Sequence, residues 1–172
     1  MMMVTFSPGV SGELPAGDWS ITVPFSALLV CVLEIAVNPA SVMAACATAC
    51  VLPITGGTVL GDAMHGKVLA GGADFQLILA DRTQAHLDAR YVLELDDGAR
   101  IWVHNTALRV TSAEDGQRLM RSEPVSPERV YFRCQPRFEA AAPQWAWLAQ
   151  HQVVGVGLRL PDAVHISVYQ VV

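Results

Sequence analysis

Apolar residues recur along this chain in short runs that are rich in β-branched and aromatic side chains and are separated by Gly, Pro and Asp pairs. Asp97-Gly98 stands between two strongly patterned runs and predicts a β-hairpin. Glycine supplies positive φ in Thr55-Gly56-Gly57-Thr58 and Ala70-Gly71-Gly72-Ala73, which we therefore expect to be turns. Proline fixes another turn at Pro161-Asp162. Many short strands with frequent turns indicate an all-β sandwich or barrel.

Only one segment has a helical pattern. Pro143 suits a first helical turn and good helix formers follow it, so we expect one short helix at residues 143–150. Residues 1–18 are rich in Gly, Pro and Ser and predict a loose N-terminal arm. Residues 19–172 contain no repeat and no change of composition, so a single domain is expected, as the length of 172 residues also suggests.

Composition and charge restrict the partners. The chain is 52% apolar and has a formal charge of -5, and this acidic balance disfavours nucleic acid as a partner. No Lys or Arg precedes Lys67, so the apolar run Phe25–Val37 lacks the basic flank that a signal peptide needs. The run is also too short for a membrane span and contains Glu34. We therefore expect a cytoplasmic protein without a membrane partner.

The sequence predicts neither a metal site nor a cofactor. Its five His are scattered, and Cys46 and Cys50 are not followed by a second ligand pair with zinc-site spacing. These two cysteines, with Cys31 and Cys134, are expected to be small buried thiols. The sequence has no GxGxxG, no phosphate-binding loop and no GxSxG, so nucleotide chemistry and an elbow-type nucleophile are disfavoured.

A two-residue turn at Asp97-Gly98 sets the register expected for the hairpin, with Arg90 opposite Asn105 and Asp88 opposite Ala107. One face then carries Asp88, Arg90 and Asn105 together with apolar side chains. An arginine among apolar neighbours needs a partner, and Asp88 is the nearest candidate. Two interpretations stay open: an arginine–carboxylate pair that holds the barrel together, or a polar patch that lines a ligand cavity.

Several short motifs occur in one order along the chain and together resemble a known family. They are Pro53-Ile54-Thr55-Gly56-Gly57-Thr58, the segment from Gly66 to Gln76, Leu87-Asp88-Ala89-Arg90-Tyr91, Asp97-Gly98, Tyr131-Phe132-Arg133, Pro136, Phe138-Glu139, Trp147-Leu148, Gly155, Gly157, Arg159 and Val168-Tyr169. From about Ser26 to the C-terminus the chain resembles the DUF3237 family of small bacterial and fungal proteins, also called UPF0311.

The resemblance implies a closed or nearly closed antiparallel barrel of the calycin or lipocalin type, and a homodimer. The family is largely uncharacterised, and the activities associated with it are carbon–carbon lyase reactions, notably the decarboxylation of phenolic acids. Many relatives carry Gly in place of Ala107 and often Thr in place of Cys134. If these positions line the cavity, the pocket of this protein is less polar than theirs.

Tyr131 and Arg133 alternate onto one face of a predicted strand and, with Arg90 inside the same barrel, make a candidate site for an aromatic acid. The planar donors of arginine suit a carboxylate, and tyrosine can exchange a proton with a phenol. The alternative is that Arg133 pairs with Glu139 or Asp74 for purely structural reasons.

Asp74 and Glu139 are the candidate acid–base groups, because burial in an apolar cavity raises the pKa of a carboxyl group toward the useful range. Asp74 has the alternative of capping the Gly71-Gly72 turn. Trp147 belongs to the aromatic residues expected in the core or at a dimer interface, or alternatively against an aromatic ligand.

These patterns, with the family resemblance, predict a cofactor-independent enzyme that binds a small aromatic or other apolar acid inside the barrel, with a lyase (decarboxylase) or isomerase reaction favoured. The candidate catalytic groups are Asp74, Tyr131 and Glu139, and the candidate substrate contacts are Asp88, Arg90, Asn105, Arg133 and Trp147. A barrel that binds the same ligand without chemistry is the first alternative, and it is favoured if both carboxylates are locked in arginine pairs. A filled barrel without a ligand-sized cavity is the second.

Overall fold

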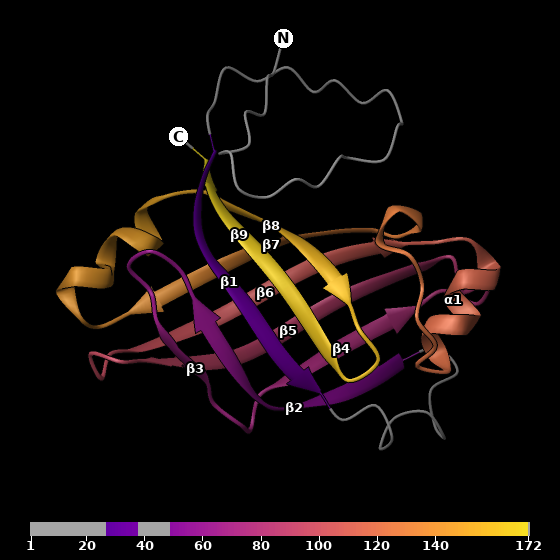
Figure 1. The fold of residues 1–172 in the computed structure, drawn as a ribbon, viewed down its shortest axis with the longest axis horizontal. Helices are drawn as coiled ribbons and strands as arrows, with labels where there is room; N and C mark the ends of the chain where they lie inside the picture. The colour runs from indigo at the N-terminus through magenta and orange to yellow at the C-terminus, as the bar shows by residue number, and fades with distance from the viewer. Residues whose placement is uncertain (1–26, 38–48, 172) are drawn as a thin grey trace, which may run out of the picture.

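Buried and exposed side chains alternate along most strands, and the strands close into an antiparallel β-barrel in the part of the chain that the computed structural model describes, residues 27–37 and 49–171 (Figure 1). The elements are β1 (Ala27–Val37), β2 (Ala49–Leu60), β3 (Gly66–Val68), β4 (Ala73–Ile78), β5 (Gln84–Leu95), β6 (Arg100–Val110), α1 (Ala113–Met120), η2 (Pro127–Arg129), β7 (Tyr131–Ala140), η3 (Pro143–Gln150), β8 (Val153–Arg159) and β9 (Ala163–Val171). The N-terminal arm expected at residues 1–18 lies outside the described residues.

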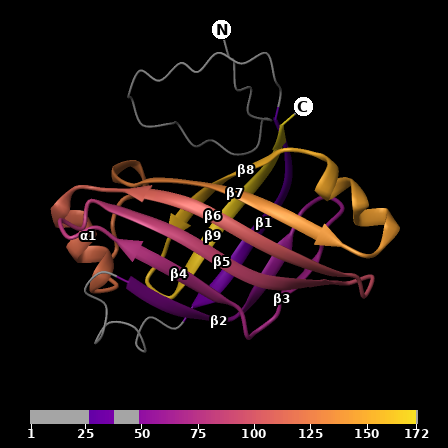
Figure 2. The ribbon, with the colours of Figure 1, turned by 180° about the vertical axis from the view of Figure 1, so that it is seen from behind.

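The strand order is β1-β9-β8-β7-β6-β5-β3-β2-β4, and the pairing of β1 with β2 closes the sheet on itself. β3 and β4 share one position in the barrel, because both pair with β2 on one side and with β5 on the other. Seen from opposite sides, the strands wrap around one interior, with α1 at one end and η3 at the other (Figures 1 and 2). The predicted all-β barrel is confirmed.

The hairpin between β5 and β6 is present, but its predicted register is wrong by one residue. The backbone N–H groups of Leu95 and Gly98 donate to Ala99 O and Leu95 O, both at 2.9 Å, so the loop contains the three residues 96–98. Gly98 has a φ of 82°, and Asp97 Oδ1 accepts a hydrogen bond from Ala99 N at 2.9 Å. These features belong to a three-residue hairpin loop, which needs glycine at its left-handed position.

The one-residue shift changes which side chains of the hairpin share a face. Arg90 pairs with His104 and Asp88 pairs with Thr106, and this face points outward. Asn105 pairs instead with Ala89, and its side chain is buried inside the barrel. The sequence analysis expected Asp88, Arg90 and Asn105 on one face of the hairpin. In the structure Asp88 and Arg90 face outward and Asn105 faces inward, because a shift of one residue in the pairing exchanges the two faces of one strand.

The predicted turns at residues 70–73 and 161–162 are confirmed, as they join β3 to β4 and β8 to β9. The turn predicted at residues 55–58 is wrong, because these residues lie inside β2. Gly56 and Gly57 have φ values of 148° and 147°, and a Cβ on Gly57 would lie 1.9 Å from Glu34 O. The two glycines thus let β1 approach β2 closely beside an irregularity in the register between Ala36 and Val37.

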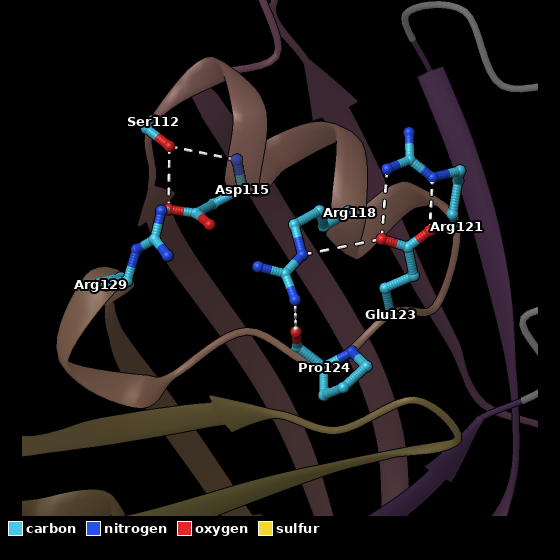
Figure 3. A network of polar contacts seen from close by, with 7 residues as sticks. All are labelled: Ser112, Asp115, Arg118, Arg121, Glu123, Pro124 and Arg129. Atoms are coloured by element: carbon cyan, nitrogen blue, oxygen red, sulfur yellow. Dashed lines mark hydrogen bonds and ion pairs between the residues drawn. The ribbon is translucent and has the colours of Figure 1, made fainter.

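The helix expected at residues 143–150 is confirmed in position as the 3-10 helix η3, whereas α1 was not predicted. Ser112 caps α1, since its Oγ accepts a hydrogen bond from Asp115 N at 3.1 Å. Figure 3 shows how the carboxylate of Asp115 is held between Ser112 Oγ at 2.8 Å and Arg129 Nη2 at 3.0 Å. Arg118 donates to Pro124 O at 2.9 Å, which ties the following loop to the helix.

The apolar core runs along the interior of the barrel, from Leu148 of η3 at one end to Ile78 and Ala85 near α1 at the other. Its almost completely buried side chains include Leu33, Met64, Leu93, Ile101, Phe138 and Leu148. The apolar run that ends at Val37 supplies β1, and in the described part of the chain no helix is long and apolar enough to cross a membrane.

Candidate active site inside the barrel

The half of the barrel toward α1 contains a small hollow of about 30 Å³, which has room for little more than ordered water unless its wall moves. Apolar side chains form most of its wall, among them Ile35, Ile54, Leu87, Phe132 and Ile166. Two polar residues, Asp74 and Asn105, belong to the same wall. An apolar pocket with a few polar groups is the usual form of a small-molecule site.

The strand register brings Asp74 and Asn105 together. Asp74 on β4 pairs with Ala89 on β5, and Ala89 pairs in turn with Asn105 on β6. All three residues line the hollow, and the small side chain of Ala89 leaves room between the two polar groups. Both polar residues were predicted as site residues from the sequence, and the structure places both in this wall.

The carboxyl group of Asp74 is buried, with 8% of the residue exposed. Its Oδ2 accepts a hydrogen bond from Gln76 Nε2 at 2.6 Å, whereas its Oδ1 has no hydrogen-bond partner among the described residues. Burial raises the pKa of Asp74 above its ordinary value, although the hydrogen bond from Gln76 and the charges of Arg109 and Arg159 act in the opposite direction. Asp74 therefore faces the interior and is not the cap of the Gly71-Gly72 turn.

Two interior arginines were not singled out from the sequence. Arg109 continues the inward-facing row of β6 and is 8% exposed, and Arg159 ends β8 with its Nη1 donating to Ala163 O at 3.1 Å. Burial and the charge of Arg159 lower the pKa of Arg109 to about 10. The alternation along β6 was the signal that could have found Arg109, because it puts Arg109 on the same face as the apolar Ile101 and Val103.

Behind Asn105 lies a second group of buried polar side chains. The Tyr91 hydroxyl and Asn105 Oδ1 have no hydrogen-bond partner among the described residues. Burial raises the pKa of Tyr91 well above its ordinary value and that of Cys134 to about 11, while the Asn105 amide opposes both shifts. Both groups therefore stay protonated at neutral pH.

The prediction that the cysteines are buried thiols is confirmed for two of them and wrong for one. Cys31 and Cys134 are buried free thiols, as predicted. Cys50 is disulfide-bonded and so does not carry the free thiol that was expected. Cys46 lies outside the described residues.

The structure places Asp88 and Arg90 on the outer face of β5, away from the hollow. The predicted pairing of these two residues is confirmed, with Arg90 Nε 3.2 Å from Asp88 Oδ1. His104 Nε2 also lies 3.0 Å from the same oxygen. The pair is exposed to solvent, so it is a surface ion pair rather than a support inside the barrel.

Tyr131, Arg133 and Glu139 share the outward-facing row of β7, whereas Phe132 and Cys134 face inward. Tyr131 is 51% exposed, and the guanidinium of Arg133 lies 5.1 Å from the centre of its ring. Arg133 Nη1 donates to Phe132 O at 3.0 Å and forms no ion pair with Glu139 or Asp74. The expected interior site of Arg90, Tyr131 and Arg133 is therefore not formed inside the barrel.

Trp147 lies on η3, at the opposite end of the barrel from the hollow, and is half-buried against the core. Its ring centre is 6.0 Å from that of His151, whose Nδ1 lies 2.8 Å from Trp147 O. In residues 27–37 and 49–171, no group of three or more His, Cys, Asp or Glu side chains is arranged to hold a metal ion.

Comparison with known sequences gives one family, described as "Protein of unknown function (DUF3237)", which matches residues 25–171. A UPF0311 protein from Rhodopseudomonas palustris is 45% identical over 121 residues, which are 70% of this chain and 78% of the relative.

Solved structures have the same fold. A conserved protein of unknown function from Rhodopseudomonas palustris superposes with a TM-score of 0.81 at 37% identity, covering 88% of this chain and 100% of the other. A protein from Penicillium herquei described as an enzyme superposes with a TM-score of 0.62 at 17% identity, covering 87% of this chain and 96% of the other. At that identity the likeness concerns the fold alone.

Proposed function

The chain belongs to the DUF3237 family, whose function is unknown, and we propose that its barrel is a cofactor-independent enzyme that binds a small apolar or aromatic acid and transfers a proton through Asp74. The single observation that carries the proposal is the Asp74 carboxyl group. It is buried in the wall of the hollow, and one of its oxygens has no hydrogen-bond partner in the described part of the chain. A buried carboxyl group in a pocket is a candidate acid or base.

The surroundings of Asp74 support this role. A carboxylate used only for structure is normally paired with an arginine, whereas Asp74 forms no ion pair with the residues that the structure describes. Burial raises the pKa of Asp74 above its ordinary value, which makes the protonated form easier to populate than in an exposed aspartate. The hydrogen bond from Gln76 orients the carboxyl group and leaves Oδ1 directed away from that contact.

The favoured reaction is a carbon–carbon lyase step, in particular a decarboxylation. Loss of carbon dioxide breaks the bond between the carboxylate and the adjacent carbon and leaves the electron pair on that carbon. Protonated Asp74 delivers its proton there, and the resulting carboxylate regains a proton from water. An isomerase would use the same group to remove a proton and to return it at another atom.

The polar group beside Asp74 suits the orientation of such a substrate. Asn105 lies one strand beyond Ala89 and presents an amide to the hollow, with the Tyr91 hydroxyl behind it. An amide and a phenol can donate to or accept from a substrate hydroxyl or carbonyl group. The neighbour from Penicillium herquei, which is described as an enzyme, is compatible with chemistry inside this fold.

The test is a turnover assay with the full chain against a panel of phenolic and other aromatic carboxylic acids, with products identified by mass spectrometry. We expect release of carbon dioxide by the wild type and a loss of about 100-fold or more in Asp74→Asn. Asp62→Asn is the matched control, because Asp62 is an exposed carboxylate in the β2–β3 connection. Unaltered turnover in Asp74→Asn would overturn the assignment, and binding without turnover would establish a non-catalytic ligand-binding barrel.

A further inference from the structure

The seam between β7 and β8 is the shortest strand pairing in the described part of the barrel wall. The two strands pair at only two positions, Arg133 with Val156 and Cys134 with Gly155. By contrast, β7 pairs with β6 along its whole length, and β8 pairs with β9 along its whole length. Two well-paired parts of the barrel therefore meet at a narrow join, which can separate locally while the rest of the fold stays intact.

The pairing of this seam stops before Phe132. If its register continued toward α1, Phe132 would pair with Gly157 and Tyr131 with Leu158, but neither pair forms. The Phe132 ring closes the wall here, since a Cβ on Gly157 would lie 2.6 Å from two of its atoms. Arg133 Nη1 donates to Phe132 O at 3.0 Å, and the Arg133 guanidinium lies 5.1 Å from the centre of the Tyr131 ring. Both contacts stay within β7, so they do not tie it to β8.

The packing at this seam also forms one side of the hollow. Phe132 belongs to the wall of the hollow, and so does Ile166, which pairs with Gly157 across β8 and β9. The closed hollow, at about 30 Å³, has room for little more than water. A ligand must therefore displace part of the wall, and the side at Phe132 adjoins the seam with the fewest strand pairs.

We propose that the β7–β8 seam is the entrance of the hollow and that the Phe132 side chain is the gate that closes it. When β8 separates from β7, the ring leaves its place against Gly157, and the hollow opens to solvent and gains the volume that the ring occupied. A small apolar or aromatic molecule enters there, and the wall closes on it. This inference goes beyond the proposed function, because it concerns access to the hollow and does not depend on the chemistry of Asp74.

Two buried free thiols of the wild-type chain report on the seam. Cys134 lies at the seam itself, whereas Cys31 lies on β1, which pairs with β9 at nine positions. The full chain is treated with N-methylmaleimide under native conditions, and peptide mass spectrometry follows the labelling of each thiol. We expect Cys134 to react at least about 10-fold faster than Cys31, because local opening of the seam exposes it while the barrel stays folded. Equal rates for the two thiols would overturn the proposal.

The size of the reagent shows whether the opening admits a ring. N-phenylmaleimide carries the same reactive group as N-methylmaleimide, with a phenyl ring in place of the methyl group. We expect it to label Cys134 at a rate within about 10-fold of that of the smaller reagent, because separation of the strands opens a gap along the seam. Labelling of Cys134 by the methyl reagent alone would show fraying too small for a ligand and would overturn the entrance.

Phe132→Leu tests the gate itself. A smaller side chain closes the seam less completely, so the labelling rate of Cys134 relative to Cys31 should rise about 10-fold. Phe138→Leu is the matched control, because Phe138 lies on the same inward-facing row of β7 but beyond the residues that pair with β8. An equal rise in both variants would show a general loosening of the barrel and would overturn the role of Phe132. If Phe132→Leu fails to fold, the comparison of the two thiols in the wild type still decides the question.

These measurements do not depend on the turnover assay, so the two proposals can fail separately. If both reagents label Cys134 preferentially and no acid is turned over, the seam stands as the entrance of a ligand-binding barrel and the proposed reaction is wrong. If turnover depends on Asp74 while Cys134 and Cys31 react at equal rates, the proposed reaction stands and the entrance at the seam is wrong.

Discussion

Gly157 leaves the space that the ring of Phe132 occupies: a Cβ on Gly157 would lie 2.6 Å from two atoms of that ring. The neighbouring Gly155 has the same relation to Cys134, whose Sγ would lie 2.4 Å from an added Cβ. The two glycines of β8 are therefore explained by side chains of β7 that fill the barrel beside them. Phe132 also borders the hollow, so this packing sets the shape of the candidate site.

Gly157→Ala should lower the free energy of unfolding by about 1–3 kcal/mol, because the added methyl group displaces a buried ring that has little room to move. Chemical denaturation of the purified variant measures the loss. In a Phe132→Val background the same substitution should cost at least about 1 kcal/mol less, since the ring atoms are gone. An equal loss of stability in both backgrounds would show that contact with the Phe132 ring is not what excludes a side chain at residue 157.

Asp74→Asn should stabilise the protein increasingly as the pH rises. Asp74 ionises near 3.8 in an unfolded chain, and its pKa is raised in the fold despite Arg109, Arg159 and Gln76, while Asp88 adds to the rise. Below the unfolded value both states hold the proton, whereas above the folded value the folded carboxylate carries the full penalty. We expect the variant to gain about 1 kcal/mol or more over the wild type at neutral pH.

Denaturation curves of both proteins between about pH 4 and about pH 8 test this expectation. The stability difference should widen with pH, because asparagine keeps an oxygen for the Gln76 hydrogen bond but cannot ionise. A difference that stays constant over this range would contradict a raised pKa for Asp74.

The hairpin register can be tested by an engineered disulfide. Asp88 pairs directly with Thr106 on the outer face, whereas Ala107 points into the barrel. Directly opposed residues have Cβ atoms near the spacing that a disulfide needs. The double variant Asp88→Cys, Thr106→Cys should therefore oxidise to a disulfide that mass spectrometry locates, and Asp88→Cys, Ala107→Cys should not. The reverse outcome would restore the register of a two-residue turn.

Asp97 connects the hairpin loop to η3, so the ionisation of its carboxyl group should change the contact between these two elements. Hydrogen bonds from Ala99 N–H, Trp145 Nε1 and Gln144 Nε2 lower the pKa of Asp97 below its ordinary value of 3.8. The stabilisation is therefore complete above about pH 4 and is lost as the pH falls through the lowered pKa. The Trp145 indole N–H resonance should shift with a midpoint below 3.8. Asp97→Asn should abolish this titration, and a midpoint above 3.8 would contradict the assignment.

The fold class could be predicted from the sequence because strand and turn signals depend on only a few neighbouring residues. The alternation in β5 and β6, the glycines at residues 71 and 72 and the proline at 143 each indicate their own element. α1 was missed because its eight residues include Gly116 and little apolar surface. Its capping pattern of Ser112 with Asp115 was the available signal.

Of the residues predicted for the candidate site, Asp74 and Asn105 line the hollow and the others do not. Asp74 was identified by its chemistry and faces inward, whereas Arg90 was considered as an interior residue although the pattern of the hairpin did not decide which of its faces lines the barrel. The indole N–H of Trp145 donates a hydrogen bond to Asp97 at 2.8 Å, although the two residues are 48 positions apart in the sequence. Asp97 lies in a hairpin loop of three residues, whereas the sequence predicted a loop of two. Such a contact is not visible in the pattern around Asp97-Gly98.

The sequence by itself determined that this chain forms a β-rich barrel with a helix near residue 143, because these features follow from local propensity and from the cost of exposing apolar side chains. Only the tertiary structure decided which arginines face the interior. A shift of one residue in strand pairing moves every side chain to the opposite face of the sheet. The closure of the barrel then gathers Asp74, Asn105, Arg109 and Arg159 inside it from three strands, β4, β6 and β8.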